Sequence, residues 1–129
     1  KMHNVYLSIE PNPKEYGTNF LNTIYQTYNF VKKVRSKNIK IILDVGEILM
    51  NSENKKIDSI IKRCINLINH VHISEPYLRL IQNKKFFEKL MSTLNKYNYE
   101  KWISIEMRSQ KKNNYDNIVK TIKLVNSYL

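Results

Sequence analysis

The sequence contains 129 residues and carries a formal net charge of +11, from 22 lysines and arginines against 11 acidic residues. Its length suits one compact domain, and a composition of 42% hydrophobic and 26% charged residues excludes a disordered chain. The single cysteine excludes a disulfide framework and a zinc site made of cysteine clusters. No apolar run approaches the ~20 residues that span a bilayer, and no signal-peptide core follows residues 1–4. We therefore expect a cytoplasmic protein without a membrane segment.

The distribution of the positive charge argues against nucleic acid as the partner. Lysine pairs at 32–33, 55–56 and 111–112 are dispersed along the sequence instead of forming one basic stretch. A solvated basic surface is therefore the preferred interpretation. A basic field that attracts a phosphorylated metabolite is the alternative.

The first apolar run, residues 5–9, predicts a short strand that ends at Glu10, because the prolines that follow interrupt regular structure. A helix is predicted from Thr18 or Asn19 to about residue 37, because its apolar residues recur at helical spacing. These residues are Phe20, Ile24, Tyr28 and Val31.

A second β-branched run, residues 39–43, predicts a strand that ends at Asp44, and Ser52 can open the helix that follows. The apolar side of that helix is expected to contain Ile57, Ile60, Ile61, Cys64, Ile65 and Ile68. The third strand is predicted at residues 70–73. The helix after it is expected to turn Phe86, Phe87, Leu90, Met91 and Leu94 inward.

The fourth strand is predicted at residues 102–105, and the last helix from Tyr115 to the end of the sequence. Ile118, Val119, Ile122 and Val125 are the apolar residues of this helix. Trp102 and the tyrosines are expected to pack between strand and helix. Cys64 is expected to be inert packing in the core.

Strands and helices thus alternate four times, without a linker between them, which predicts parallel strands joined by helical crossovers. The polar strand ends are about 30 residues apart, which suits an open doubly wound sheet or a (β/α) TIM-type barrel. A complete barrel takes ~250 residues, so four βα units would form half of one. We expect residues 1–129 to form a single α/β domain.

Residues that can bind a metal stand at the ends of the predicted strands, where parallel α/β folds carry their sites. Glu10, Asp44, His72 and Glu106 each end a different strand. Carboxylates that converge in one cleft repel one another unless a cation lies between them. Oxygen and imidazole ligands without a thiolate favour Mn²⁺, Mg²⁺ or Co²⁺, with zinc as a further option. The alternative interpretation is that these are ordinary polar residues that stand at the strand ends by coincidence and bind no metal.

The third strand contains two histidines, His70 and His72, which are expected on the same face because strand side chains alternate. We select His72 as the ligand because it lies nearer the carboxyl end of the strand. A lone histidine beside a strand is more often structural, so the three acidic strand ends carry this assignment.

Five segments carry a resemblance to a known family. In chain order they are Ile9-Glu10-Pro11-Asn12-Pro13, Tyr16-Gly17, Leu43-Asp44-Val45-Gly46, His70-Val71-His72-Ile73-Ser74-Glu75-Pro76 and Trp102-Ile103-Ser104-Ile105-Glu106-Met107. Together they resemble the C-terminal half of sugar phosphate isomerases/epimerases of the xylose isomerase-like TIM-barrel superfamily. Ketose 3-epimerases and endonuclease IV also belong to that superfamily. The resemblance covers essentially the whole chain, as the fifth to eighth βα units of the barrel.

By this resemblance, Glu10, Asp44, His72 and Glu106 match the metal shell of the family, and Glu10 and Glu106 would be the catalytic acid/base pair. Family members that are isomerases or epimerases move a proton at the carbon next to a carbonyl, through an enediolate. The resemblance therefore implies a metal-dependent isomerase or epimerase that acts on a sugar or sugar phosphate.

Four further residues are candidate substrate contacts. Arg79 resembles an arginine that contacts substrate oxygens in some members, although a solvated arginine at a helix start explains it equally well. Glu47 stands where many members have a histidine, which is a departure from the family pattern. Glu75 and Arg108 follow the third and fourth strand ends closely.

The four βα units that form the first half of the family's barrel are absent from the sequence. The chain is then a fragment, a half barrel that pairs with a second copy or with a separate N-terminal half, or a degenerate remnant. A non-catalytic interaction module is accordingly the alternative function. A DNA-repair nuclease like endonuclease IV is disfavoured, because its multinuclear zinc site needs more histidines than the three present.

Overall fold

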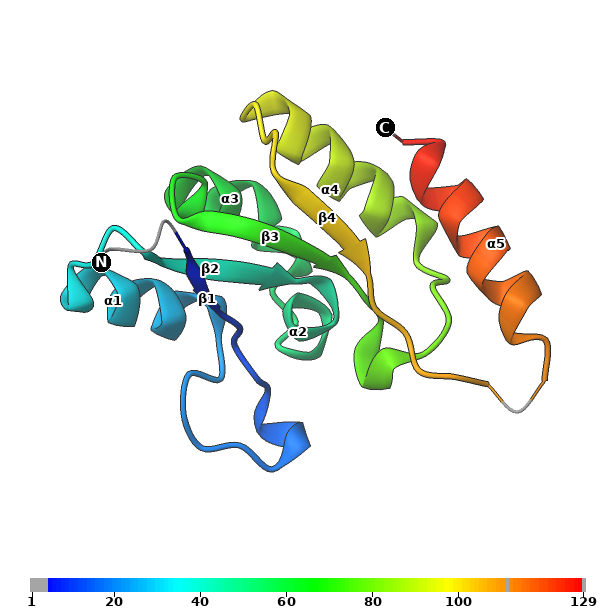
Figure 1. Ribbon diagram of the computed structural model, residues 1–129, viewed down its shortest axis with the longest axis horizontal. Coiled ribbons are helices and arrows are strands. Elements are labelled where there is room, and N and C mark those ends of the chain that lie inside the picture. The colour runs from blue at the N-terminus through cyan, green and yellow to red at the C-terminus, as the bar shows by residue number, and fades with distance from the viewer. Residues whose placement is uncertain (1–4, 111, 129) are drawn as a thin grey trace.

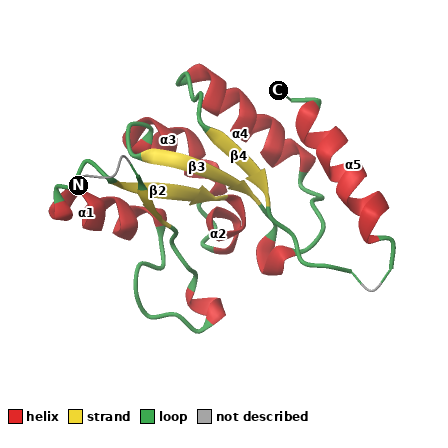
Figure 2. Cartoon of the chain, viewed as in Figure 1, coloured by secondary structure: helices red, strands yellow, loops and turns green. Residues whose placement is uncertain are grey.

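The computed structural model describes residues 5–110 and 112–128, in which strands and helices alternate (Figures 1 and 2). The strands are β1 (Leu7–Ile9), β2 (Ile39–Asp44), β3 (Ile68–Ile73) and β4 (Trp102–Ile105). The α-helices are α1 (Ile24–Val34), α2 (Val45–Met50), α3 (Ile57–Cys64), α4 (Lys84–Lys96) and α5 (Asn114–Asn126). Short 3₁₀ turns occupy η1 (Lys14–Tyr16), η2 (Asn54–Lys56) and η3 (Pro76–Leu78). No helix in these described ranges is long and apolar enough to cross a membrane.

The four strands form one parallel sheet in the order β1-β2-β3-β4, as the βα alternation predicts. In this register Asp44 lies opposite His72, and His72 lies opposite Ser104. Because the strands are parallel, all four carboxyl ends lie at one edge of the sheet. This edge is where the metal-binding residues were expected.

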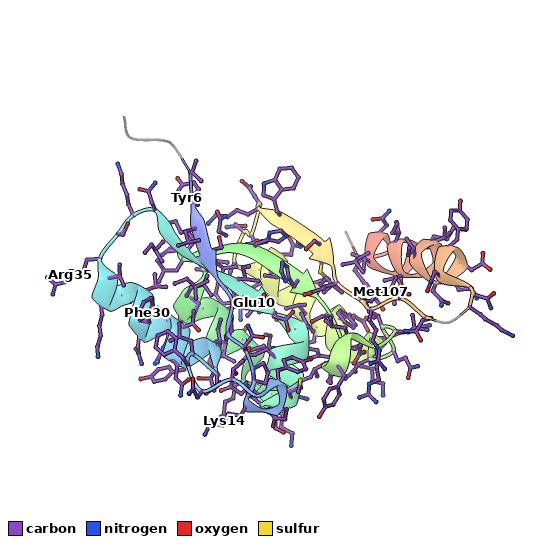
Figure 3. The ribbon with its side chains drawn as sticks, turned by 60° about the horizontal axis from the view of Figure 1, so that its bottom comes forward. Tyr6, Glu10, Lys14, Phe30, Arg35 and Met107 are labelled. Atoms are coloured by element: carbon purple, nitrogen blue, oxygen red, sulfur yellow. The ribbon has the colours of Figure 1, made fainter. Side chains whose placement is uncertain are left out.

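The helices cover one face of the sheet. Strand residues such as Leu43 and Val71 are fully buried and join helix residues such as Phe87 and Leu90 in one core cluster. The residues that alternate with them, including His70, point to the other face and stay partly exposed. Figure 3 shows this face of the sheet with its side chains. Helices outside and an open inner face are the arrangement of a partial TIM barrel, which confirms the predicted fold class.

Helix α1 begins later than the sequence pattern predicted. Thr23 caps it, because its side-chain oxygen accepts a hydrogen bond from the backbone N–H of Gln26 at 3.2 Å. The predicted start at Thr18 or Asn19 is therefore wrong. Phe20 lies outside the helix, is 64% exposed and meets the ring of Phe30 edge to face.

The segment after β2 also differs from the prediction. The short helix α2 follows Asp44 directly and was not predicted, whereas α3 begins at Ile57 and not at Ser52. Ser52 has a φ of 55°, in the left-handed region, so it terminates one helical segment instead of opening the next.

Two apolar residues lie elsewhere than predicted, and both belong to strands of the sheet. Ile68, expected on a helix, begins β3 and is fully buried in the sheet. Trp102, expected between strand and helix, is 78% exposed because its position in β4 directs it to the open face. Cys64 is buried in the core, as expected.

Candidate functional site

The four predicted metal ligands converge at the carboxyl edge of the sheet. Glu10 directly follows β1, Asp44 ends β2, His72 lies in β3, and Glu106 directly follows β4. Figure 3 labels Glu10 at the end of its strand. One ligand atom from each of the four residues lies within 4.8 Å of the others. This spacing suits ligands around a single ion, because metal–oxygen and metal–nitrogen bonds are about 2.0–2.6 Å long.

His72 joins the two carboxylates that come from the outer strands. Its Nδ1 atom lies 2.8 Å from Oε1 of Glu10 and 3.1 Å from Oε2 of Glu106. The hydrogen bond with Glu10 is the main cause that raises the pKa of His72, and partial burial opposes it. Nδ1 of His72 therefore contacts both candidate acid/base residues.

Asp44 is the buried member of the group. Its Oδ1 accepts a hydrogen bond from the backbone N–H of Glu47 at 2.7 Å, and its Oδ2 accepts one from the hydroxyl of Ser74 at 2.8 Å. Burial is the main cause that raises the pKa of Asp44 to about 6, and these two hydrogen bonds oppose the shift. The charges of Glu10 and Glu106 raise this pKa further. Three carboxyl groups and one imidazole, held together at this cost, fit a divalent cation.

Ser74 and Gly46 hold Asp44 in place. The Ser74 hydroxyl oxygen accepts a hydrogen bond from the Gly46 N–H at 2.7 Å while donating to Asp44. A Cβ atom on Gly46 would lie 2.9 Å from this hydroxyl oxygen and 3.0 Å from the carbonyl oxygen of Glu75. Only glycine therefore lets the start of α2 approach the loop after β3 this closely.

The Gly46→Ala variant is expected to lose about 1–3 kcal/mol of unfolding free energy, because the added methyl group overpacks this contact. Urea unfolding measures the loss. Gly17→Ala is the control, because a Cβ there meets no atom within 4 Å and only the left-handed backbone is strained. A Gly46→Ala variant as stable as the wild type would contradict the proposed packing.

A cavity of about 430 Å³ opens beside these residues. Its lining consists of Glu10, Pro11, Asn12, Pro13, Tyr16, Asp44, Tyr77, Leu78, Glu106 and Arg108. The cavity thus combines three of the four candidate metal ligands with an apolar and aromatic side. Such a combination suits a small polar ligand that also has an apolar face.

The family model described as "Xylose isomerase-like TIM barrel" matches residues 1–128. The chain belongs to the xylose isomerase-like TIM-barrel family. This finding confirms the family that the five sequence segments indicated. Among curated proteins, no significant match is found.

Solved structures of sugar epimerases have the same fold as this member of the xylose isomerase-like family. The 3-keto-D-glucoside 4-epimerase of E. coli superposes with a TM-score of 0.80 at 18% identity, over 95% of this chain and 46% of that one. A D-psicose 3-epimerase gives a TM-score of 0.69 at 21% identity, over 95% and 46% of the two chains. An L-ribulose 3-epimerase gives 0.67 at 24% identity, over 92% and 39%. The chain thus spans less than half the length of these structures.

The predicted substrate contacts of this family member lie in different environments. Arg108 lines the cavity. Arg79 is exposed, and its Nε donates a hydrogen bond to the carbonyl oxygen of Pro76 at 3.0 Å. The carboxylate of Glu75 accepts hydrogen bonds from the backbone N–H groups of residues 82 and 83. Neither Arg79 nor Glu75 lines the cavity.

Glu47 is enclosed by the chain and is only 1% exposed. Its Oε1 accepts hydrogen bonds from the backbone N–H of Ile24 at 3.2 Å and from the side chain of Asn51 at 2.6 Å. A carboxyl group in these surroundings cannot reach a ligand in the cavity. The expectation that Glu47 contacts substrate is therefore corrected, because its side chain joins α2 to the start of α1.

Ser74, Tyr16 and Tyr77 are among the site residues that the sequence did not predict. Ser74 supports Asp44, while Tyr16 and Tyr77 form part of the cavity wall. Their positions just after β1 and β3 were the available signal, because loops at the carboxyl ends of parallel strands build such sites. His70 lies on the same face as His72, as predicted, with ring centroids 4.8 Å apart.

Proposed function

We propose that the barrel to which this chain contributes is a divalent-metal-dependent isomerase or epimerase of a sugar or sugar phosphate. The observation that carries the proposal is the convergence of Glu10, Asp44, His72 and Glu106 within 4.8 Å at the carboxyl edge of the sheet. The sugar epimerases that share this fold support this reaction class.

The four converging residues would hold the cation, which would be Mn²⁺, Mg²⁺ or Co²⁺, with zinc as a further option. A divalent cation bound there polarises a carbonyl or hydroxyl oxygen of the substrate and stabilises negative charge on it. Asp44 is fixed by Ser74 and by the N–H of Glu47, so its role is to hold position rather than to move a proton.

Glu10 and Glu106 would act as the acid/base pair. They come from the two outer strands of the sheet, and both line the cavity. One carboxylate would remove the proton from the carbon next to the substrate carbonyl, and the other would return a proton from a different side. His72, in contact with both carboxylates, would keep their orientation fixed.

Catalysis would need a second half barrel. The inner face of the sheet is open, and the chain spans 46% of the length of two matching epimerase structures. Another four βα units would cover this face and complete the cavity wall. They would come from a preceding segment of the same protein, from a separate chain or from a second copy.

Solvent-deuterium exchange tests the proposal on the complete barrel assembly, loaded in turn with Mn²⁺, Mg²⁺ and Co²⁺. We expect label to enter at a carbon next to the carbonyl in at least one sugar or sugar phosphate of a broad panel. The His72→Ala variant should lose the exchange together with metal binding. An assembly that binds metal but exchanges no label in any sugar would favour the alternative, a non-catalytic half-barrel module.

A further inference from the structure

Two tyrosines join the loops that follow β1 and β3. The Tyr16 hydroxyl oxygen accepts a hydrogen bond from the backbone N–H of Tyr77 at 2.9 Å, and the two rings meet edge to face at 5.9 Å between centroids. Both residues line the cavity that contains Glu10 and Glu106. We call Tyr16 and Tyr77 the tyrosine bracket.

The tyrosine bracket continues an apolar side of the cavity. Pro11, Pro13 and Leu78 line the cavity beside it, whereas the carboxyl groups belong to the strand ends. A sugar presents a similar division, since its hydroxyl groups project outward and its C–H bonds form apolar faces. Aromatic and apolar groups can receive a C–H face while polar groups bind the hydroxyls.

The charges around the cavity disfavour a phosphate group. Among the described residues, Arg108 is the one cationic side chain in the lining, and it faces three acidic ones. A bound divalent cation, added to the charges of Arg108 and the three carboxylates, would bring the net charge of the lining to about zero. A phosphate dianion would therefore meet no net attraction from these groups.

Two backbone N–H groups just ahead of α4 are bound by the protein itself. Barrels of this type often bind phosphate near the loops after the last two strands, at backbone N–H groups by a helix N-terminus. In this chain, Oε1 of Glu75 accepts hydrogen bonds from the N–H of Gln82 at 2.9 Å and from that of Asn83 at 2.8 Å, just ahead of α4. A carboxylate of the protein thus already accepts from two backbone N–H groups that could otherwise bind a phosphate.

Arg79, which lies two residues after Tyr77, already has contacts within the protein. Its Nε donates to the carbonyl oxygen of Pro76, and its guanidinium lies 5.7 Å from the centre of the Tyr77 ring. Arg79 therefore supports the tyrosine bracket from outside.

Building on the proposed function, we infer that this half barrel selects an unphosphorylated sugar. The tyrosine bracket receives the C–H face of the sugar, and Glu75 excludes a phosphorylated substrate by filling the N–H groups ahead of α4. The bracket residues determine specificity, and Glu75 acts as a positioning residue for the loop.

The test compares free sugars with their phosphates on the complete barrel assembly loaded with Mn²⁺. The probes are D-fructose and D-tagatose and the 6-phosphate of each, measured by deuterium exchange and by titration calorimetry. The wild type should favour the free sugars at least tenfold in kcat/KM or in affinity. Tyr77→Ala should weaken the free sugars about tenfold, mainly through KM, and leave Mn²⁺ affinity unchanged. Tyr16→Phe, which keeps the ring, should have a smaller effect.

Glu75→Ala should raise the relative acceptance of the 6-phosphates about tenfold, because it frees two N–H groups. Glu75→Gln is the control: its amide oxygen still accepts from both N–H groups, so it should keep the wild-type preference for free sugars. Preferred binding of the phosphates by the wild type, or no binding of any probe, would overturn the inference. Exchange confined to the phosphates would leave the proposed function standing. Binding of free sugars through Tyr77 without any exchange would contradict the proposed function alone.

Discussion

Glutamine in place of Glu10 or of Glu106 is expected to reduce turnover of the complete barrel by about 10³-fold, since an amide cannot remove or return a proton at the substrate carbon. Both carboxylates line the cavity, and both contact Nδ1 of His72. KM should change only a few-fold, because an acid/base pair acts chiefly in the transition state. Steady-state kinetics at saturating Mn²⁺ provides the measurement.

Asp44→Asn is the matched control, because Asp44 is a proposed metal ligand without a role in proton transfer. It should require more metal but recover activity when Mn²⁺ is in excess, whereas the Glu10 and Glu106 variants should not recover. Retention of more than a tenth of wild-type turnover by Glu106→Gln would show that this carboxylate does not move the proton.

The Glu47→Gln variant is expected to be more stable than the wild type at pH 9, by about 2–4 kcal/mol. Burial is the main cause that raises the pKa of Glu47 to about 8, and the neighbouring charge of Glu53 adds to it. The side-chain hydrogen bond from Asn51 opposes the shift. Within the described part of the chain, the Oε2 atom of Glu47 is buried and has no hydrogen-bond partner. The folded protein therefore favours the protonated carboxyl group.

The direction of the pH dependence follows from this raised pKa. Between the usual glutamate value of 4.5 and about 8, the folded state binds more protons at Glu47 than the unfolded state does. Wild-type stability therefore falls as the pH rises through this window, by about 5 kcal/mol at most. Glutamine is neutral throughout, but its amide group must lie where Oε2 lacks a partner, which costs about 1–3 kcal/mol.

Urea unfolding between pH 5 and pH 9 checks this prediction. The advantage of Glu47→Gln should vanish near pH 5 and grow toward pH 9. Glu88→Gln is the control, because Glu88 is exposed on α4. Parallel stability curves for Glu47→Gln and the wild type would show that Glu47 is not held protonated by the fold.

The strands were predictable because each is a short segment rich in apolar residues that ends at or beside a polar residue. The short helix α2 was missed because it follows β2 directly, with no loop between the two elements. The spacing Asp44-x-x-Glu47 was an available signal, since an acidic cap followed three residues later by glutamate is typical of a helix start. Phe20 was placed in a helix because its spacing fits, although Thr23 provides the actual cap.

The candidate ligands were predictable because parallel topology alone brings strand ends together. The tyrosine bracket was not, because its contact joins residues 61 positions apart through a left-handed backbone at Tyr77. The burial of Glu47 could not be predicted from the sequence either. A glutamate three residues after a strand end reads as a cavity residue, and only the packing of α2 against the start of α1 turns it inward.

The sequential strand order has a consequence for how the sheet is shaped. In a flat sheet, β1 and β4 would be three strand spacings apart, or about 14 Å, and β1 and β3 about 10 Å. Glu10 and Glu106 nevertheless both reach the same nitrogen of His72, at 2.8 and 3.1 Å. Curling of the sheet toward its inner face would bring these strand ends closer still, so an ion held by all four would resist flattening of the barrel wall. Metal affinity would then depend on closure of the barrel wall, and an assembly in which the sheet flattens would bind the ion more weakly.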